Sequence, residues 1–512
     1  MSRKAKRISY NLNNYNLIRS RELGLKPKLG HGADISKKLY SNLDVCRPKV
    51  PVEKTKCEQG GIFNLEFSFD GRMLVSACKE RSVLIFDAAN QKMIKKINEA
   101  HCNCVNCVRF LNDYTFATCS DDNTIKVWDT RMLNCATRTL QGHSNWVKNI
   151  EYSEKENVMV TSAFDGSIYA WDLNSPTENN VLYDKVFVMN GLMRTKLTPD
   201  GTKMVICTTS GYIIIIHDLN LRTLSHDMKT FRPNLYRLMQ LSEQTFPAAT
   251  MFNYLFYHSR KSNRLEFIDD FPNDVEVISS LQIHPMGWNA LSRSINGSEN
   301  EEWTSVHDIQ SRDASDYEDA YLYVLDSALP DINAEESPPE DVENARPTDI
   351  WMGFITNEQL SAQRSQRNQS NQENLHSSMG IIHSGLVGRD NYTRYFRKRP
   401  EDRFRIVKNL PRLTHFIKEQ SVGKGYIKEL CYSSDGRIIC SPYGKGVRLL
   451  AFDEQLQEVS YCVPEKPREL FTVAEINDYH PDVVVCCKFS PKHYQLVSGC
   501  LGGEIVWYHP IL

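Results

Sequence analysis

The chain has 512 residues, and its 61 lysines and arginines against 63 aspartates and glutamates give a formal net charge of −2. This balance gives no global reason to expect nucleic-acid binding. The apolar runs are short, as in Ile213–Ile216, whereas a membrane-spanning helix needs about 18 consecutive apolar residues. The composition therefore favours a globular protein with no direct nucleic-acid or membrane contact.

Residues 1–57 form a polar, basic arm. The first residues, MSRKAKRISYNLNNYN, lack the apolar stretch of a secretory signal. We therefore expect an intracellular protein, in the nucleus and/or the cytoplasm, whose fifteen cysteines are reduced thiols. Small apolar faces in 17–25 and 35–43 leave two interpretations open. The arm is either a disordered leader or a helix-loop-helix that docks onto something.

One pattern occurs twice between Ala100 and Asn174. The copies read AHCNCVNCVRFLNDYTFATCSDDNTIKVWDTR and GHSNWVKNIEYSEKENVMVTSAFDGSIYAWDLN, with the early histidines 42 residues apart and the late tryptophans 43 residues apart. A unit of about 40–45 residues with an early His and a late Trp-Asp is the signature of a WD-repeat propeller blade. The sequence therefore predicts an all-β, seven-bladed WD-repeat β-propeller once its weaker copies are counted.

Each strong copy also carries a polar set that blades of this class bury together. The members are His101, Thr118, Asp122 and Trp128 in the first copy, and His143, Thr161, Asp165 and Trp171 in the second. An imidazole that bonds to a carboxylate and a hydroxyl beneath an indole satisfies groups that burial would otherwise penalise. A hydrolase with a His-Asp-Ser/Thr set is disfavoured, because the set recurs in each copy and no nucleophile-elbow sequence is present.

Weaker copies place blades one to four in residues 58–225. Phe86 stands where blade one should have its tryptophan, and His217-Asp218 replaces Trp-Asp in blade four, which we expect to begin near Phe187. Residues 226–272 have no clear blade pattern and are interpreted as an insertion. Residues 273–310 are a degenerate fifth blade that closes on His307-Asp308.

Residues 311–403 are first acidic and then rich in Gln, Asn and Ser. This composition predicts a disordered insertion, so that disordered insertions lie around the fifth blade. Blades six and seven occupy 404–512, with Trp507 near the last closing position. Because the last strand ends near residue 510, a strand near the N-terminus must seal the ring, and we expect it between Arg47 and Glu58.

A cysteine-rich stretch raises the alternative of a metal site. His101, Cys102, Cys104 and Cys107 lie within seven residues, but structural zinc sites normally draw paired ligands from two separated segments. We interpret these cysteines, together with Cys486 and Cys487, as apolar thiols of strands. We expect no metal, no cofactor and no catalytic residues.

The end of the first strong copy reads D-x-T-I-x-x-W-D-x-R, from Asp122 to Arg131. This arrangement resembles the docking box of WD-repeat substrate receptors of cullin-4 RING ubiquitin ligases. The resemblance extends over about 58–225, 275–310 and 404–512, through segments such as GGIFNLEFSFDG, HSNWVKNIEYS, LMRTKLTPDGTKM, GYIKELCYSSDGR and VSGCLGGEI. The arm around SRELGLKPKLG is also similar, which favours docking helices, whereas 226–272 and 311–403 do not share it.

The resemblance implies a non-catalytic substrate receptor, with ubiquitin transfer carried out by other subunits. Its partners would be the damage-specific DNA-binding adaptor protein, cullin-4 and an unknown protein substrate. The implied adaptor-docking residues are Asp122, Trp128, Asp129 and Arg131, with the arginine projecting from the propeller rim.

Two competing classes of function are a direct enzyme, which would need a constellation of residues that the sequence lacks, and a generic scaffold, which would not need Arg131. W-D-x-R also occurs in propellers unrelated to ligases, and Asn174 and Asn220 stand at the arginine position in blades three and four. Arg131 would then be an ordinary solvated loop residue, and the chain a generic WD-repeat scaffold unrelated to ubiquitin. The sequence does not identify the substrate.

Overall fold

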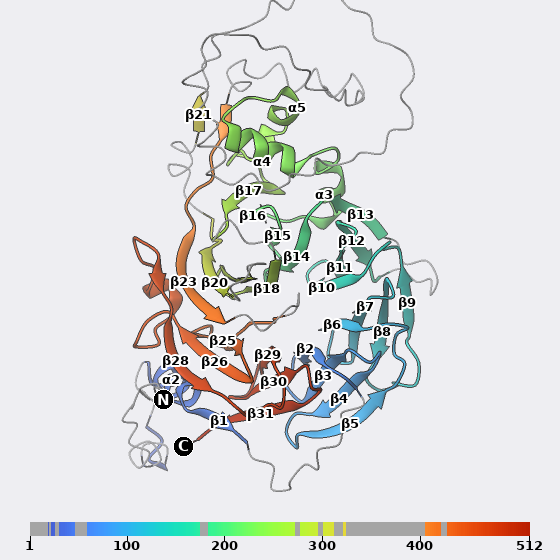
Figure 1. The fold of residues 1–512 in the computed structure, drawn as a ribbon, viewed down its shortest axis with the longest axis vertical. Helices are drawn as coiled ribbons and strands as arrows, with labels where there is room; N and C mark the ends of the chain where they lie inside the picture. The colour runs from blue at the N-terminus through green and yellow to red at the C-terminus, as the bar shows by residue number, and fades with distance from the viewer. Residues whose placement is uncertain are drawn as a thin grey trace, which may run out of the picture.

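The described residues form seven radial β-sheets arranged in a closed ring (Figure 1). The structure is a computed structural model that describes residues 19, 22–25, 30–46, 59–174, 183–271, 277–294, 301–311, 321–323, 405–420 and 428–511. In most sheets the strands follow one another in chain order, each antiparallel to the last; the exceptions are β1 (Leu43–Val45), which joins the C-terminal strands, and β27 (Arg468–Glu469), which is added in parallel. The all-β propeller predicted from the repeat is confirmed. Within the described residues, no helix is both long enough and apolar enough to cross a membrane.

Blades one to three are regular four-stranded sheets. Blade one contains β2 (Ile62–Phe67), β3 (Met73–Cys78), β4 (Val83–Asp87) and β5 (Lys92–Ile97). Blade two contains β6 (Val105–Phe110), β7 (Thr115–Ser120), β8 (Thr124–Asp129) and β9 (Arg138–Gln141). Blade three contains β10 (Val147–Ser153), β11 (Val158–Ala163), β12 (Ser167–Asp172) and β13 (Tyr183–Val188). Phe187 therefore belongs to the outer strand of blade three and does not open blade four.

Blade four encloses the first insertion. Its strands are β14 (Leu192–Leu197), β15 (Met204–Thr208), β16 (Tyr212–His217) and β17 (Arg264–Asp269). Between β16 and β17 lie α3 (Leu221–Asp227), α4 (Pro233–Ser242), α5 (Pro247–Thr250) and the 3-10 turn η1 (Asn253–Leu255). Aromatic residues of these turns, including Phe231 and Tyr236, pack against Phe267 of β17. Residues 226–272 are thus a packed helical insertion followed by the last strand of blade four, and a boundary at 225 divides that blade.

Blade five is interrupted in the same way. It contains β18 (Val277–Ile283), β19 (Trp288–Ser294), β20 (Glu301–Asp308) and, beyond the second insertion, β23 (Leu413–Gln420), with the short β27 (Arg468–Glu469) added in parallel. Of residues 311–403, the structure describes 311 and β21 (Tyr321–Tyr323), which pairs with β22 (Arg405–Val407). The predicted disorder of this insertion otherwise lies outside the described residues. Because β23 completes blade five, blade six begins after 420 and not at 404.

Blades six and seven close the ring. Blade six contains β24 (Cys431–Tyr432), β25 (Ile438–Tyr443), β26 (Gly446–Ala451) and β28 (Phe471–Ile476), with the 3-10 turn η3 (Val459–Tyr461) before β27. Blade seven contains β29 (Val484–Phe489), β30 (Leu496–Cys500) and β31 (Ile505–Pro510) from the C-terminus and β1 (Leu43–Val45) from the arm. The expectation that the sealing strand lies between Arg47 and Glu58 is wrong. Leu43 pairs with Pro510 and Val45 with Tyr508, because the helix α2 (His31–Ser41) brings the chain directly onto this edge.

Hydrophobic side chains fill the spaces between neighbouring blades. Val127 of blade two, for example, packs in one cluster with Ile150 and Trp171 of blade three. Since every blade buries one face against the blade before it and the other against the blade after it, none has a complete core by itself. The closing strand β1 therefore stabilises the whole ring.

The innermost strands are also joined by charge. Lys488 of blade seven lies 2.6 Å from Glu66 of blade one, and Arg109 of blade two lies 3.3 Å from Glu66 and 3.8 Å from Glu151 of blade three. Lys196 of blade four completes the chain at 2.7 Å from Glu151. Glu66 keeps its charge in this setting: burial acts to raise its pKa, but Lys488 and Arg109 hold that pKa below its usual value. Alternating charges thus link five consecutive blades around the central channel.

Candidate docking surface

The strand order gives the propeller two distinct faces. In each blade the connections between the first and second strands and between the third and fourth strands lie at one edge, which we call the lower face. The connections between the second and third strands and between successive blades lie at the opposite edge, the upper face. This follows because consecutive strands are antiparallel.

The structure brings the four polar residues of blade two into one hydrogen-bonded chain. His101 Nδ1 lies 3.0 Å from Asp122 Oδ2, and His101 Nε2 lies 2.8 Å from Thr118 Oγ1. Trp128 donates from Nε1 to the same Thr118 Oγ1 at 2.9 Å. The loop before β6, the strand β7, the following turn and the strand β8 are thereby tied together. These contacts explain why the residue types recur at fixed spacing.

Blade three repeats this arrangement. His143 Nε2 lies 2.8 Å from Thr161 Oγ1, which also accepts a 2.8 Å bond from Trp171 Nε1. His143 Nδ1 lies 3.1 Å from Ser167 Oγ and 3.4 Å from Asp165 Oδ2. The set therefore contains a second hydroxyl, Ser167, that the sequence comparison did not include.

The carboxylates of these sets are held in their charged form. Burial acts to raise the pKa of Asp122, but hydrogen bonds from His101 and Thr124 hold that pKa well below its usual range. For Asp165 burial is likewise opposed by bonds from His143 and Ser167, and its pKa is also well below the usual range. Both groups sit in turns on the upper face, so their role is to fasten each blade at that face.

Arg131 lies on the lower face, directly after β8. Its side chain is 67% exposed, and its guanidinium makes a forked pair with Asp129, through Nε at 2.9 Å and Nη2 at 2.6 Å. The guanidinium carbon also lies 4.8 Å from the ring centre of Tyr114. These bonds from Arg131 lower the pKa of Asp129 to about 2. The arginine is therefore held in one orientation at the surface, because a charge-assisted forked pair restricts it.

The structure divides the four residues of the expected docking box. The Asp122 carboxylate is 10% exposed and lies on the upper face, in the turn before β8. Trp128 lies near the lower end of β8, next to Asp129, but it is only 3% exposed. Asp129 and Arg131 follow at that lower end, which at about 3.3 Å per residue is roughly 20 Å from Asp122. Only Asp129 and Arg131 can therefore meet a partner at the lower face, whereas Asp122 and Trp128 support the strand that presents them.

The helix α2 packs on the lower face as well. Tyr40 is buried, with its ring 5.4 Å from Phe489 and 5.0 Å from Tyr494 of blade seven. Its hydroxyl lies 2.7 Å from Ser434 Oγ of blade six. Tyr494 and Ser434 belong to connections between first and second strands, which define the lower face. The second apolar face expected in the arm therefore docks onto the propeller itself.

The first apolar face of the arm has a different environment. Leu23 and Leu25 are 65% and 60% exposed. Leu17 and Ile18 lie outside the described residues, so the predicted helix-loop-helix is described only in its second half.

Exposed apolar side chains gather on the lower face from blade six round to blade two. Those on the connections of that face are Tyr461, Val463, Tyr494, Phe69, Tyr114 and Met132. They run from the region beside α2 to the two sides of Arg131. Exposed apolar groups around a fixed charged group are typical of protein–protein interfaces.

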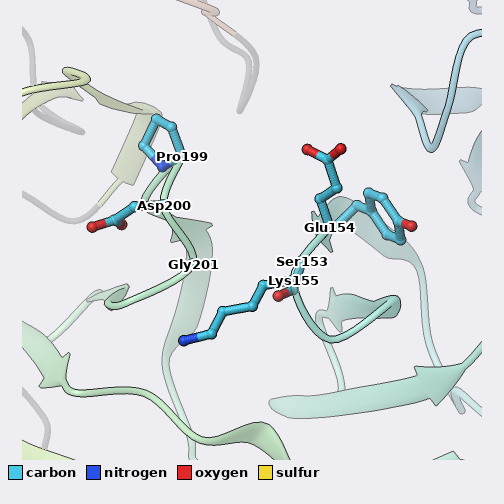
Figure 2. A pocket seen from close by; sticks show the side chains of 7 residues that line it. Ser153, Glu154, Lys155, Pro199, Asp200 and Gly201 are labelled. Atoms are coloured by element: carbon cyan, nitrogen blue, oxygen red, sulfur yellow. The ribbon is translucent and has the colours of Figure 1, made fainter.

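A shallow groove continues this face between blades three and four. It encloses about 300 Å³ and is lined by Tyr152, Ser153, Glu154, Lys155, Pro199, Asp200 and Gly201. Figure 2 shows that these residues come from two turns, one in each blade, with the charged ends of Glu154, Lys155 and Asp200 pointing in different directions. The groove lacks the convergent polar groups and apolar lining of a small-molecule site.

Blade seven contains a partial polar set that the sequence did not reveal. His480 Nε2 lies 2.7 Å from Ser498 Oγ, which lies 2.8 Å from the hydroxyl of Tyr508. Leu496 pairs with Tyr508 as Phe116 pairs with Trp128, so Tyr508 and not Trp507 takes the indole position. His480 and Ser498 are 18 residues apart, as are His143 and Thr161. This shared spacing could have revealed the polar set of blade seven from the sequence.

The cysteine-rich stretch of blade two does not form a ligand cluster. Both ring nitrogens of His101 are engaged by Asp122 and Thr118. Cys102 is exposed and Cys107 is buried, so the chain directs their side chains to different environments.

Comparisons with known proteins support the fold and indicate the relatives. The WD domain, G-beta repeat model matches residues 50–87, 92–129 and 134–172. The chain is similar to "DDB1- and CUL4-associated factor 10" of Danio rerio, at 36% identity over 92% of this chain and 78% of the relative. The Xenopus laevis protein of that name is 35% identical over 92% and 89%, and the Homo sapiens protein 34% identical over 88% and 70%.

Proposed function

This chain belongs to the DDB1- and CUL4-associated factor 10 family, and from that premise we propose that it is a non-catalytic substrate receptor of a cullin-4 RING ubiquitin ligase. The names of its relatives refer to association with DDB1 and CUL4. In the proposed role the chain holds a target protein while other subunits transfer ubiquitin. The adaptor DDB1 binds the lower face and the target binds elsewhere on the propeller.

One observation carries the proposal. Arg131 and α2 are far apart in the sequence, yet both lie on the lower face, with exposed apolar residues of blades six to two between them. A single partner resting on this face can touch both. The upper face, where the polar sets of blades two and three end, is then left for the target.

Arg131 suits an interface because its geometry is already fixed. Asp129 engages Nε and Nη2, so the Nη1 side of the guanidinium can donate to a carboxylate or carbonyl oxygen of the adaptor. Little side-chain freedom remains to be lost on binding. Lysine could not reproduce both the forked pair and the outward donor.

The test measures binding of the purified full chain to purified DDB1. Arg131→Ala and Arg131→Glu should weaken binding by roughly 30-fold or more, the level of an interface hot spot. Arg81→Ala changes an exposed arginine on the upper face and should leave affinity unchanged. Melting temperatures of all three variants should match that of the wild type.

The outcomes separate the two candidate roles. Full DDB1 binding by both Arg131 variants would remove Arg131 from the interface and leave α2 and the arm to carry it. No binding by the wild-type chain would favour the alternative of a generic scaffold unrelated to ubiquitin.

A further inference from the structure

Three cysteine thiols meet where blade six packs against blade seven. Cys431 comes from β24, Cys440 from β25 and Cys487 from β29, and their sulfur atoms all lie within 4.8 Å of one another. The Sγ atoms of Cys431 and Cys487 are 3.5 Å apart, and Cys431 pairs directly with Cys440 across the two strands. All three side chains are buried.

The surroundings of this trithiol cluster are apolar. Ile438, Val447, Leu449, Phe489 and Tyr508 belong to the same hydrophobic cluster. Within the part of the chain that the structure describes, the group of potential ligands holds three thiols and no imidazole or carboxylate. A structural zinc ion normally takes four ligands, so the cluster is one donor short for zinc.

The spacing fits a centre bound by three sulfurs. With a metal–sulfur bond of about 2.3 Å, three sulfurs around one centre are roughly 4 Å apart. The Cys431–Cys487 separation is 3.5 Å, and none of the three separations exceeds 4.8 Å. Side-chain shifts of about 1 Å or less would bring all three sulfurs to the distance that one centre requires.

The charge of the bound centre decides which three-coordinate complex suits this apolar site. Three thiolates carry three negative charges, so a monovalent or divalent ion leaves a net negative complex in an apolar core, where uncompensated charge is costly. A trivalent centre gives a neutral complex. We propose that Cys431, Cys440 and Cys487 form a binding site for a trivalent thiophilic centre of the arsenic(III) class.

Binding of arsenous acid needs no electron transfer. Three As–O bonds break and three As–S bonds form, while each thiol proton leaves with a hydroxide as water, giving three waters per arsenic. Arsenic stays trivalent and each sulfur keeps its oxidation state. The product joins the first two strands of blade six to the first strand of blade seven.

The strand β24 provides a route for entry. It has two residues, Cys431 and Tyr432, whereas the first strands of blades one to five have six or seven. Short pairing of this kind favours local opening without global unfolding. Opening of β24 exposes Cys431 and the space between the other two thiols.

The test uses the full chain, one equivalent of arsenous acid and native mass spectrometry. The wild type should gain one arsenic atom and lose three hydrogens, whereas Cys440→Ser and Cys487→Ser should not retain arsenic. Cys107→Ser is the matched control, because Cys107 pairs with Cys119 across the strands of blade two, outside the trithiol cluster. It should bind arsenic as the wild type does.

A second measurement requires no variant. Arsenous acid should protect Cys431, Cys440 and Cys487 of the wild type from slow alkylation, as mapped by peptide mass spectrometry, and leave the exposed Cys102 reactive. Absence of arsenic uptake by the wild type, or equal uptake by Cys440→Ser, would overturn the proposal. Tighter binding of copper(I) than of arsenic(III) in direct competition would overturn the charge argument.

Discussion

In blades two and three the third strand closes with an indole, Trp128 or Trp171, whose hydroxyl partner lies ten residues earlier in the chain. In blades four and five the same closing position holds an imidazole, His217 or His307, and both rings are fully buried. The interior of a blade must satisfy its polar groups in either case. Blade four does so with partners much further apart along the sequence, whereas in blade five neither ring nitrogen of His307 has a hydrogen-bond partner among the described residues.

Blade four uses a cluster of ionised groups. His217 Nε2 lies 2.9 Å from Glu266 Oε2, and Arg412 donates to both oxygens of Glu266 at 2.7 and 2.8 Å. Burial opposes the charge of Glu266, but bonds from His217 and attraction to Arg412 lower its pKa to about 2. Glu266 and Arg412 are 146 residues apart, on either side of the second insertion. The ion pair fastens blade four to the segment directly before β23, the strand that completes blade five.

Acidification should produce the largest difference between these regions. Burial lowers the pKa of His217, His284, His415 and His480 to about 4 and that of His307 to about 3. In the unfolded chain these rings take up protons near pH 6.5, whereas in the folded chain they stay neutral until about pH 4. The stability that the folded chain gains by keeping these rings neutral is therefore complete above about pH 6.5 and is lost as pH falls toward 4.

At pH 5.5 each such histidine should lower the free energy of unfolding by about 1.4 kcal/mol relative to neutral pH. Together these histidines should lower it by several kcal/mol. The carboxylates of Asp122 and Asp165, with pKa values well below the usual range, lose their contribution only at lower pH. Hydrogen exchange at pH 7.5 and 5.5 should show amides of β16–β20 losing protection before those of β6–β12. Simultaneous loss in both regions would contradict this division.

Trp171→Ala tests the blade held by local partners. Trp171 is 1% exposed, packs its ring 4.9 Å from Tyr183 and donates to Thr161. Truncation should lower the free energy of unfolding by about 3–5 kcal/mol, the range for a large buried aromatic. Phe86 occupies the same position in blade one but is half-buried. Phe86→Ala should therefore lower the free energy of unfolding by less, as measured by chemical denaturation. Equal losses would show that the indole has no special role.

Arg412→Met tests the blade held by distant partners. Removal of the guanidinium leaves the Glu266 carboxylate buried without its main counter-charge, which should cost about 3–5 kcal/mol. The same change combined with Glu266→Leu removes both charges and should restore most of the loss. A double-mutant cycle measured by denaturation gives the coupling between the two side chains. Additive losses would contradict a direct ionic link.

This contrast explains what could be predicted from the sequence. The resemblance to WD-repeat blades predicts all eight residues of the two strong polar sets, because each set comes from fewer than 30 consecutive residues and keeps its place in the repeat. The propeller followed from the same repeat. Glu266 and Arg412 carry no repeat signal, since their pairing depends on how two insertions leave and re-enter the ring.

The misplaced sealing strand has a related cause. Leu43–Val45 is three residues long, too short for an alternating pattern to stand out, and its pairing with β31 is set by α2. The docking box shows a second limit of a sequence pattern. Asp122 and Arg131 belong to one short motif, yet the strand β8 lies between them, and Trp128 is buried beside Asp129 at the lower end of that strand.

The smallest expected effect concerns the partial polar set of blade seven. Tyr508 is fully buried and its hydroxyl bonds to Ser498, but Gly502 stands where blades two and three have an aspartate. Without that carboxylate, the hydrogen bond between Tyr508 and Ser498 joins two neutral groups. A neutral hydrogen bond contributes about 0.5–1.5 kcal/mol to stability, less than a hydrogen bond to a charged group. Tyr508→Phe should therefore lower the free energy of unfolding by about 1 kcal/mol.

Tyr432→Phe is the control, because its buried hydroxyl has no hydrogen-bond partner among the described residues, and it should be neutral or slightly stabilising. If Tyr508→Phe costs as much as Trp171→Ala, blade seven depends on its polar set as strongly as blade three does, and the anchoring carboxylate is not what distinguishes them.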